Sequence, residues 1–427
     1  MDKVLSQNRW EGIKIAVSVG FFLAYRELRR ANPWTTLLIV FVMMLTFLNL
    51  VVISGILVGL IEGSENANKD LYTSDVIISP LTERQYIRES PRIEKVVESA
   101  PGFVALTTRY VEGGTVISNY KDTLRPDQAY NKAGGSFAGI DPEKEDQVTN
   151  LSSTVVEGEY LEAGDTDSIL IGASLLFKYT PIESPGFTVL KNVEVGDRVK
   201  ITVNENSREM FVKGIVKSKV GEVDARVFML EGELRKLINR SDLNVDEMAI
   251  DVSDSYGADS FKSYLIANGV DDYARVQTWE DAQPKFLKDI KITFALLGNV
   301  ISSIGLVVAC ITIFIVIFVN AITRRRYIGI LKGIGVTRGA IEISYVLQAI
   351  FYALVGVVLG MIIVFVMLKP ALDANPIDFP FSDGILVATL GGTLFRALIL
   401  FIATLIAGYI PAYIVIKQNT LNAILGR

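Results

Sequence analysis

Long apolar segments and polar segments alternate along this chain. Trp34–Ile61, Ile292–Thr323 and Ile343–Leu368 contain no charged residue, and Gly384–Ile416 contains only Arg396. A helix that crosses a bilayer needs about 20 predominantly apolar residues, and each of these segments is longer than that. The pattern therefore predicts an α-helical membrane protein with four transmembrane helices.

The charges beside the apolar segments predict the orientation in the membrane. The polar block from Ile61 to Ile290 holds 40 acidic and 26 basic residues, whereas Met1–Pro33 holds three acidic and six basic ones. The link Arg324–Ile343 holds one acidic and five basic residues. Short segments rich in Lys and Arg stay in the cytoplasm. We therefore expect a cell-membrane protein with both termini and the link in the cytoplasm and the polar block outside.

These two patterns together predict nine segments. They are a cytoplasmic N-terminus with an interfacial amphipathic helix (1–33), transmembrane helix 1 (34–61), an extracytoplasmic α+β domain with stalk helices (62–290), transmembrane helix 2 (291–322), a cytoplasmic coupling link (323–342), transmembrane helix 3 (343–368), a short external loop (369–383), transmembrane helix 4 (384–416) and a cytoplasmic C-terminus (417–427).

The polar block has the composition of an α+β domain. Runs such as "DVIISP", "RVKITVN" and "ARVFML" are typical of strands, and "EGG" (112–114) and "NEN" (204–206) are typical of hairpin turns. We expect two lobes joined near 141–168. The polar residues at 62–72 and 280–291 are expected to extend the adjoining transmembrane helices as stalks, with flexible linkers as the alternative. Helices are predicted near 84–99, 172–179, 230–239 and 257–268.

The residue types that most hydrolytic and metal chemistry needs are missing. The chain has no histidine, which removes His-based triads and most catalytic zinc sites. It has no Gly-x-x-x-x-Gly-Lys-Ser/Thr sequence for binding nucleotide phosphates. Its one cysteine, Cys310, can form no disulfide within the chain. We expect neither an enzyme, a cofactor, a metal site nor a nucleic-acid partner.

Small residues in the apolar segments predict close helix contacts. Gly55 and Gly59, and Gly356 and Gly360, have the four-residue spacing that lets two helices approach each other. Packing within the chain and a dimer face are both open for these pairs. Arg396 is expected near the outer interface, where its side chain can reach the polar region.

The basic link combines cations with apolar residues and glycines. Its sequence, "RRRYIGILKGIGVTRGAIEI", suits a docking element better than a solvated loop. A basic loop held on anionic lipid is the alternative. The residues assigned to docking are Ile330, Leu331, Lys332, Gly333, Ile334, Gly335, Arg338 and Ile341.

Several of these stretches resemble one family. "IGILKGIGVTRGAI" (328–341) resembles the "EIGILRALGATRRQI" signature of the FtsX-like, or MacB-type, ABC transporter permeases. "LAYRELRR" (23–30) and "IPAYIVIKQNTLNAILGR" (410–427) are similar to that family's sequences before its first span and at its end. "GIDPEKEDQVTNLSSTVVEGEYL" (139–161) and "VQTWEDAQP" (276–284) resemble the lipoprotein-releasing, LolC/LolE-like branch.

The resemblance implies a permease subunit with a MacB-like periplasmic core domain. Such a subunit would form a homodimer, or a heterodimer with a related permease, and bind separate ABC ATPase subunits through the link. ATP-driven movement would be passed to the outside domain by mechanotransmission, to export or release a lipid-linked or hydrophobic substrate such as a lipoprotein. Membrane lipid and an extracytoplasmic protein are further expected partners. The alternative is an FtsX-like signalling protein that activates a cell-wall hydrolase.

Overall fold

A computed structural model describes residues 2–121, 130–182, 188–375, 377–379, 382–384 and 386–417. The chain forms two compact units, which we describe separately. The helical unit comprises Met1–Leu60, Asp289–Ile377 and Gly384–Arg427, and the α/β unit comprises Ile61–Lys288 and Asp378–Asp383.

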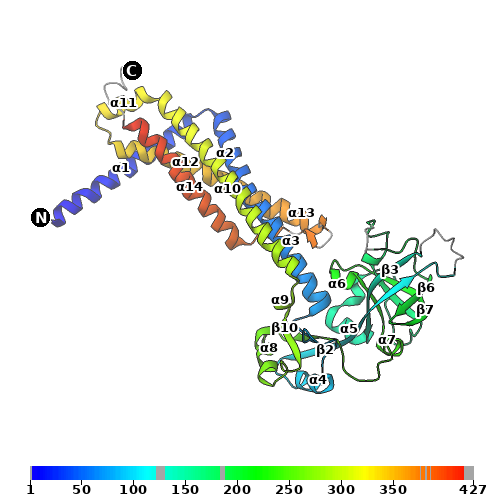
Figure 1. The fold of residues 1–427 in the computed structure, drawn as a ribbon. Coiled ribbons are helices and arrows are strands. Elements are labelled where there is room, and N and C mark those ends of the chain that lie inside the picture. The colour runs from blue at the N-terminus through cyan, green and yellow to red at the C-terminus, as the bar shows by residue number, and fades with distance from the viewer. Residues whose placement is uncertain are drawn as a thin grey trace. The chain divides into compact units, whose positions relative to one another are not determined.

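The helical segments of the chain include four that are long and apolar enough to cross a membrane (Figure 1). These four are Pro33–Thr73, Lys285–Thr323, Arg338–Ala374 and Leu390–Ile416, and they confirm the four apolar helices predicted from the sequence. The elements are α1 (Asp2–Arg30), α2 (Pro33–Leu48), π-helix η1 (Asn49–Ile53), α3 (Ser54–Asn68), π-helix η2 (Lys69–Thr73), α10 (Lys285–Thr323), α11 (Arg325–Gly333), α12 (Arg338–Ile362), π-helix η5 (Ile363–Leu368), α13 (Lys369–Ala374) and α14 (Leu390–Ile416).

Helix α12 lies at the centre of the helical unit, in contact with α1, α2 and α14. Gly356 allows the approach of α2, because a Cβ added there would lie 2.6 Å from the Cβ of Met43. Gly360 faces the ring of Phe47 in the same way. Such contacts let two backbones pack closely where apolar burial gives little driving force.

The first predicted glycine pair and Arg396 also lie in packed positions. A Cβ on Gly55 would come within 2.8 Å of Leu386, and Gly59 is buried. Arg396 donates a hydrogen bond from Nη2 to the hydroxyl of Ser54 at 2.9 Å. All four glycines therefore pack against this chain itself.

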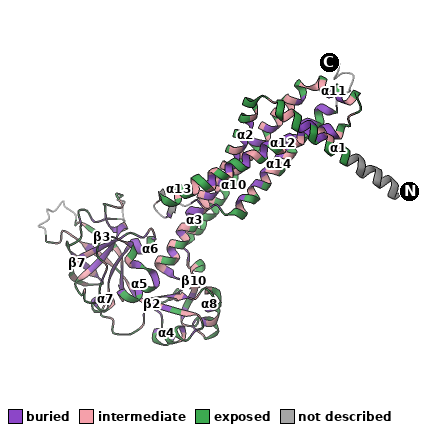
Figure 2. Cartoon of the chain, turned by 180° about the vertical axis from the view of Figure 1, so that it is seen from behind, coloured by how far each residue is buried: buried purple, intermediate pink, exposed green. Residues whose placement is uncertain are grey.

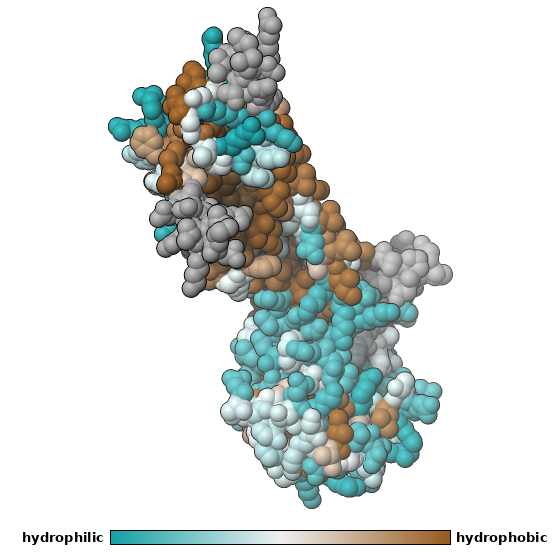
Figure 3. All heavy atoms as spheres, turned by 90° about the vertical axis from the view of Figure 1, so that its left-hand side faces the viewer, coloured by the Kyte–Doolittle hydropathy of each residue, from teal (hydrophilic) through white to brown (hydrophobic). Residues whose placement is uncertain are grey.

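Helix α10 is less buried within the described chain than the other three apolar helices are (Figure 2). Much of the face of the helical unit seen in Figure 3 is hydrophobic. Such a surface suits lipid or a second membrane helix rather than water. The exposed apolar side chains of α10 include Ile292, Leu296, Val300, Ile304, Val307, Ile311, Ile315 and Val319.

The α/β unit contains a ten-stranded mixed sheet, which confirms the predicted α+β class. The strand order is β10-β1-β9-β2-β3-β8-β5-β7-β4, and β6 pairs with β2 and β7. The strands are β1 (Val76–Pro80), β2 (Phe103–Ile117), β3 (Lys132–Ile140), β4 (Val155–Gly158), β5 (Ser168–Gly172), β6 (Arg198–Val203), β7 (Asn206–Val216), β8 (Arg226–Leu230), β9 (Glu247–Val252) and β10 (Ala274–Thr278), with β11 (Ile377–Phe379) and β12 (Ser382–Gly384) in a separate pair.

Short helices connect these strands. They are α4 (Ser90–Glu98), α5 (Pro142–Thr149), η3 (Leu151–Thr154), η4 (Ala173–Leu175), α6 (Gly221–Asp224), α7 (Glu231–Leu237), α8 (Ala258–Ala267) and α9 (Trp279–Ala282). The helices predicted near 84–99, 230–239 and 257–268 are thus confirmed as shorter elements. The one predicted at 172–179 is wrong, because only a 3₁₀ turn forms there.

Strand β2 joins the two parts of the sheet. Its first half, to Arg109, pairs with β9, and its second half, from Tyr110, pairs with β3. The small part of the sheet is therefore β1, β9 and β10, and the large part is β3–β8. The two parts meet along β2, so the junction expected near 141–168 is wrong.

One of the two predicted hairpin turns is also wrong. "EGG" at 112–114 lies inside β2, where Gly113 pairs with Ser136. Gly114 is required for packing rather than for a turn, because a Cβ there would lie 2.7 Å from the Phe137 ring. The turn at 204–206 is confirmed, with Val203 of β6 paired to Asn206 of β7.

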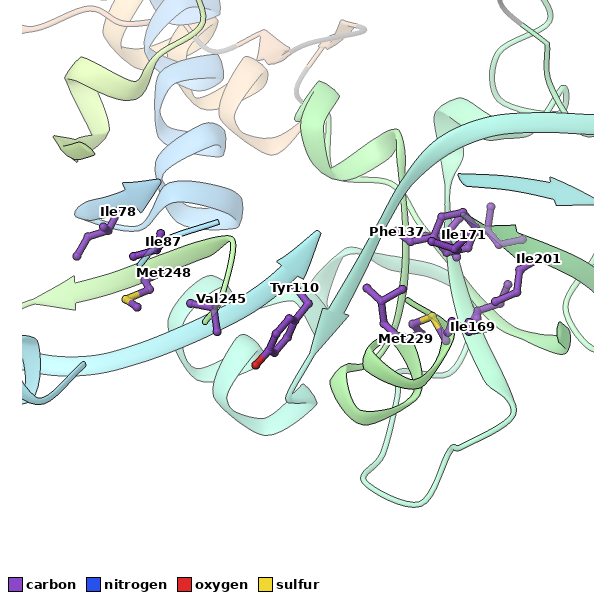
Figure 4. Packing of buried hydrophobic residues seen from close by; sticks show 14 of the residues in the cluster. Ile78, Ile87, Tyr110, Phe137, Ile169, Ile171, Ile201, Met229, Val245 and Met248 are labelled. Carbon is purple, nitrogen blue, oxygen red and sulfur yellow. The ribbon is translucent and has the colours of Figure 1, made fainter. Parts of the chain in front are cut away.

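A continuous apolar cluster fills both parts of the sheet (Figure 4). Tyr110 lies between the side chains of the small part, such as Ile78 and Met248, and those of the large part, such as Phe137 and Ile169. The two parts therefore share a core.

Candidate functional site

The basic link folds as the short helix α11, followed by a defined turn. The amide of Gly335 donates to the carbonyl of Lys332 at 3.1 Å, and the amide of Val336 donates to that of Leu331 at 3.0 Å. These two bonds form a Schellman motif, in which the residue after the helix cap has a positive φ. Gly335 has φ +99° and meets this requirement. The turn that ends the helix therefore explains why residue 335 is a glycine.

The link has a buried face and an exposed face. Leu331 and Ile341, which the sequence assigned to docking, are 9% and 2% exposed and belong to the core of the helical unit. The predicted docking role is therefore wrong for these two residues, because their side chains cover the helix core. Ile330 is 51% exposed and Ile334 is 73% exposed. Of the other residues assigned to docking, Gly333, Gly335 and Arg338 are exposed too.

Lys332 is engaged within the chain. Its Nζ donates to the backbone carbonyl of Ile416, at the last residue of α14. A cation at a helix C-terminus is stabilised by the helix dipole and by the free carbonyl groups. Burial and, next, the nearby Arg338 lower the pKa of Lys332. We therefore assign Lys332 to fixing α11 on α14 rather than to the exposed face.

A polar cluster that the sequence did not reveal lies beside the start of the link. Gln348 of α12 donates from Nε2 to Glu27 of α1 at 2.6 Å, and Arg324 lies 3.4 Å from the other oxygen of Glu27. Asn320 of α10 donates to Gln348 at 3.4 Å. Gln348 is buried, and a buried polar group is costly unless it is paired. The cluster therefore ties α1, α10 and α12 together where α11 begins.

A cavity of about 420 Å³ adjoins this polar cluster. Its lining includes Thr36, Asn320 and Tyr352, so helices α2, α10 and α12 all reach it. Gln348 was the available sequence signal, as an amide within an otherwise apolar span. Its partner Glu27 could not be identified, because 321 positions separate the two residues.

Comparison with known proteins matches the helical unit to a family. Residues 299–420 match the model described as "FtsX-like permease C-terminal". A curated relative, "Uncharacterized ABC transporter permease YknZ" of Bacillus subtilis (strain 168), is 23% identical over 241 residues. That match covers 50% of this chain and 60% of the relative, so the chain spans less than two thirds of its length.

Two solved structures share low similarity with the chain. The periplasmic region of MacB from Actinobacillus actinomycetemcomitans is 12% identical, with a TM-score of 0.33, over 50% of this chain and 92% of that one. The extracellular domain of the noncanonic ABC-type transporter YknZ from Gram-positive bacteria is 12% identical, with a TM-score of 0.31, over 48% and 98%.

The chain thus combines four helices that are long and apolar enough to cross a membrane with an α/β unit. Residues 299–420, which include α11, α12, α14 and part of α10, match the FtsX-like permease C-terminal model, and the chain is similar to the ABC permease YknZ. The family resemblance read from "IGILKGIGVTRGAI" is thereby confirmed.

Proposed function

We propose that this protein is a non-catalytic permease subunit that couples ATP hydrolysis by a separate ABC ATPase to conformational work outside the cell membrane. The exposed face of α11 carries the proposal. Ile330 of α11, Ile334 directly after it and Arg338 at the start of α12 are exposed, whereas the opposite side of α11, with Ile328 and Leu331, is buried in the helical unit. A partner that binds this face moves the helix, and the helix moves the spans packed on it.

Docking on a protein explains this face better than lipid contact does. Lipid attraction needs cations alone, yet the most exposed apolar residue of the link is Ile334, which is 73% exposed. An apolar residue beside a cation suits a groove with an apolar floor and an acidic rim. Gly333 also favours docking, because a Cβ added there would have no atom of the neighbouring described residues within 4 Å.

We further propose that both termini and the link are cytoplasmic and that the α/β unit is extracytoplasmic. The charge asymmetry supports this orientation. Single cysteines at the exposed positions Glu205 and Thr337, on a Cys310→Ala background, test it in intact cells. Glu205→Cys should react with an impermeant thiol reagent and Thr337→Cys should not. The opposite labelling pattern would refute the orientation.

The substrate class follows from the spans and is part of the proposal. Among the described residues of the apolar segments, Arg396 is the one Asp, Glu, Lys or Arg, and it is hydrogen-bonded to Ser54. Polar pathways normally contain such residues. Export or release of a lipid-linked or hydrophobic substrate, by a homodimer or a heterodimer, fits this better. Activation of a cell-wall hydrolase is the alternative, and neither role requires a polar path through the membrane.

Replacing Ile334 by Asp tests the docking face. A carboxylate buried without a partner costs several kcal/mol, which corresponds to about a hundredfold or more in affinity. We expect co-purification of the ATPase subunit to fall strongly at equal permease levels. Arg326→Gln should change recovery little, because an exposed charge contributes about 0–1 kcal/mol.

A second control separates docking from a general effect of adding an acid. Leu243 of the α/β unit is also exposed, at 61%, so Leu243→Asp makes the same kind of change elsewhere. It should leave ATPase recovery unchanged. Leu331→Asp is unsuitable, because its carboxylate would enter the core of the helical unit. Wild-type recovery with Ile334→Asp would overturn the proposed docking.

A further inference from the structure

Arg109 is among the largest fully buried side chains of the described chain, at 1% exposed. Its Nη2 donates to Glu145 at 2.7 Å and to the backbone carbonyl of Tyr72 at 2.9 Å, and its Nη1 donates to Glu247 at 3.2 Å. Glu145 is itself 1% exposed and also accepts from Thr107 at 2.9 Å. The guanidinium is therefore bonded to three different segments of the α/β unit.

A second buried arginine completes the arrangement. Arg226 donates to both oxygens of Glu247, at 2.7 and 3.0 Å, and to the hydroxyl of Tyr72 at 3.2 Å. That hydroxyl donates to Glu247 at 3.1 Å. The guanidinium carbons of Arg109 and Arg226 lie 5.2 and 4.9 Å from the centre of the Tyr72 ring. We call Tyr72, Arg109, Glu145, Arg226 and Glu247 the Arg109 hub.

The positions of these residues in the fold are as informative as their bonds. Arg109 is the last residue of β2 that pairs with β9, opposite Glu247. Arg226 begins β8 in the large part of the sheet, and Glu145 lies in α5. Tyr72 lies in η2, directly after α3. The hub therefore joins the end of the first stalk helix to both parts of the sheet at their junction.

Stability alone is a weak reason for such a hub. Two arginines and two glutamates balance in charge, but burying them carries a desolvation cost that well-packed apolar residues would avoid. What charged hydrogen bonds add is direction, since each bond fixes an angle as well as a contact. Apolar packing at the same place would hold the segments together but would let them tilt.

We propose that the Arg109 hub is the joint that holds the stalk end of α3 in one orientation to both parts of the sheet, so that movement of the stalk displaces the whole α/β unit. Its residues act as positioning residues. This inference rests on the proposed function, since it says how conformational work reaches the outside domain.

The test removes part of the Arg109 hub without changing its net charge. Arg109→Met/Glu145→Leu removes one charge of each sign, deletes the ion pairs of Arg109 with Glu145 and Glu247, and leaves Arg226 paired with Glu247. Tyr72→Phe is a milder variant that keeps all four charges and removes one hydroxyl. As a control, Lys213→Met/Asp165→Leu deletes an ion pair of the same unit that is 2.7 Å apart, only partly buried and outside the Arg109 hub.

Distances between spin labels provide the readout, in the full chain with its co-purified ATPase. Labels at the exposed residues Asn66 and Asp259 report the stalk against the small part, and Asn66 with Glu205 reports it against the large part. Wild type and the Lys213 control should give narrow distance distributions. Both hub variants should broaden them, the double variant more than Tyr72→Phe.

A second label pair distinguishes failure of the hub from failure of the proposed function. Labels at Leu390 and Asp259 should change distance when wild type binds ATP and vanadate, and this change should shrink in the double variant. If wild type shows no change, the proposed function fails. If wild type changes and the hub variants match it with equally narrow Asn66 distances, the hub proposal is overturned. Gel filtration and circular dichroism check that each variant is folded. If the double variant misfolds, the Asn66 distances of Tyr72→Phe alone test the hub proposal.

Discussion

The basic link and the Arg109 hub both concentrate cations, but they use them in opposite ways. The link holds five cations and one acid within 20 residues, and its Arg326 and Arg338 are exposed. The hub holds two arginines and two glutamates, each arginine hydrogen-bonded to glutamate. Charge in excess at a surface is available to a partner, whereas charge matched inside the fold fixes its geometry.

Solvent accounts for most of the difference in energy between the two regions. Water screens an exposed charge, so losing one in the link changes little. A buried charge that loses its partner keeps its desolvation cost and loses its compensation. The same kind of substitution should therefore have very different effects in the two regions.

The largest expected effect comes from breaking the hub on one side only. Arg109→Met leaves Glu145 buried without its guanidinium, so we expect a loss of about 3–5 kcal/mol in the unfolding free energy of the α/β unit. Trp279 lies in this unit, and its fluorescence reports unfolding in urea once Trp10 and Trp34 are replaced by Phe.

The double variant sharpens this prediction. Arg109→Met/Glu145→Leu removes both charges and should recover most of the lost stability, because no unpaired charge remains. An equal loss in the single and double variants would show that packing, and not charge pairing, dominates at the hub.

A smaller effect is expected from acid. Burial alone would raise the pKa of Glu247, but Arg226 and Arg109 outweigh it and lower this pKa from 4.5 to about 2. A carboxyl group with a lowered pKa stabilises the fold fully above its unfolded value, and this contribution is lost as the pH falls through the folded value. The contribution of Glu247 should therefore be constant above pH 4.5 and fall away toward pH 2.

Arg226→Met is the control for this pH dependence. Without Arg226, less positive charge opposes protonation of Glu247, so its contribution should be lost at a higher pH. Urea midpoints followed by Trp279 fluorescence from pH 7 to pH 3 measure both profiles. Identical profiles for wild type and Arg226→Met would contradict the assigned cause of the lowered pKa.

The apolar helices could be predicted from the sequence, whereas the contacts between distant residues could not. Each span is a long uncharged run, so Ile292–Thr323 needed no partner to be recognised. Arg109 reads as an ordinary polar residue of a strand, because its partner Glu247 lies 138 positions away. Ile330 and Leu331 are adjacent and equally apolar, so the sequence could not tell which one faces the core. The partner of Arg109 and the burial of Leu331 both depend on the direction of a side chain, and that direction is fixed only when the chain packs.

The smallest effects are expected at the two glycines of the link that face outward. Gly335 has φ +99°, a backbone conformation that costs other residues about 1–2 kcal/mol. Gly333 is the last residue of α11 and has no positive φ, so alanine there should be tolerated in the permease alone. Gly335→Ala should weaken the Schellman turn, and hydrogen exchange at the amide of Val336 should become about tenfold faster, since 1.4 kcal/mol corresponds to a factor of ten.

The amount of ATPase that co-purifies should then distinguish the role of Gly333 from that of Gly335. Gly333→Ala should leave the exchange at Val336 unchanged but lower recovery of the ATPase, because its methyl group lies on the exposed face beside Ile334. Gly335→Ala should lower recovery only as far as the turn is loosened, and less than Ile334→Asp does. Faster exchange with Gly333→Ala, or full recovery with it, would mean that this glycine serves the helix and not the partner. The link would then resemble the Arg109 hub, because contacts within the chain and not a partner would determine its geometry.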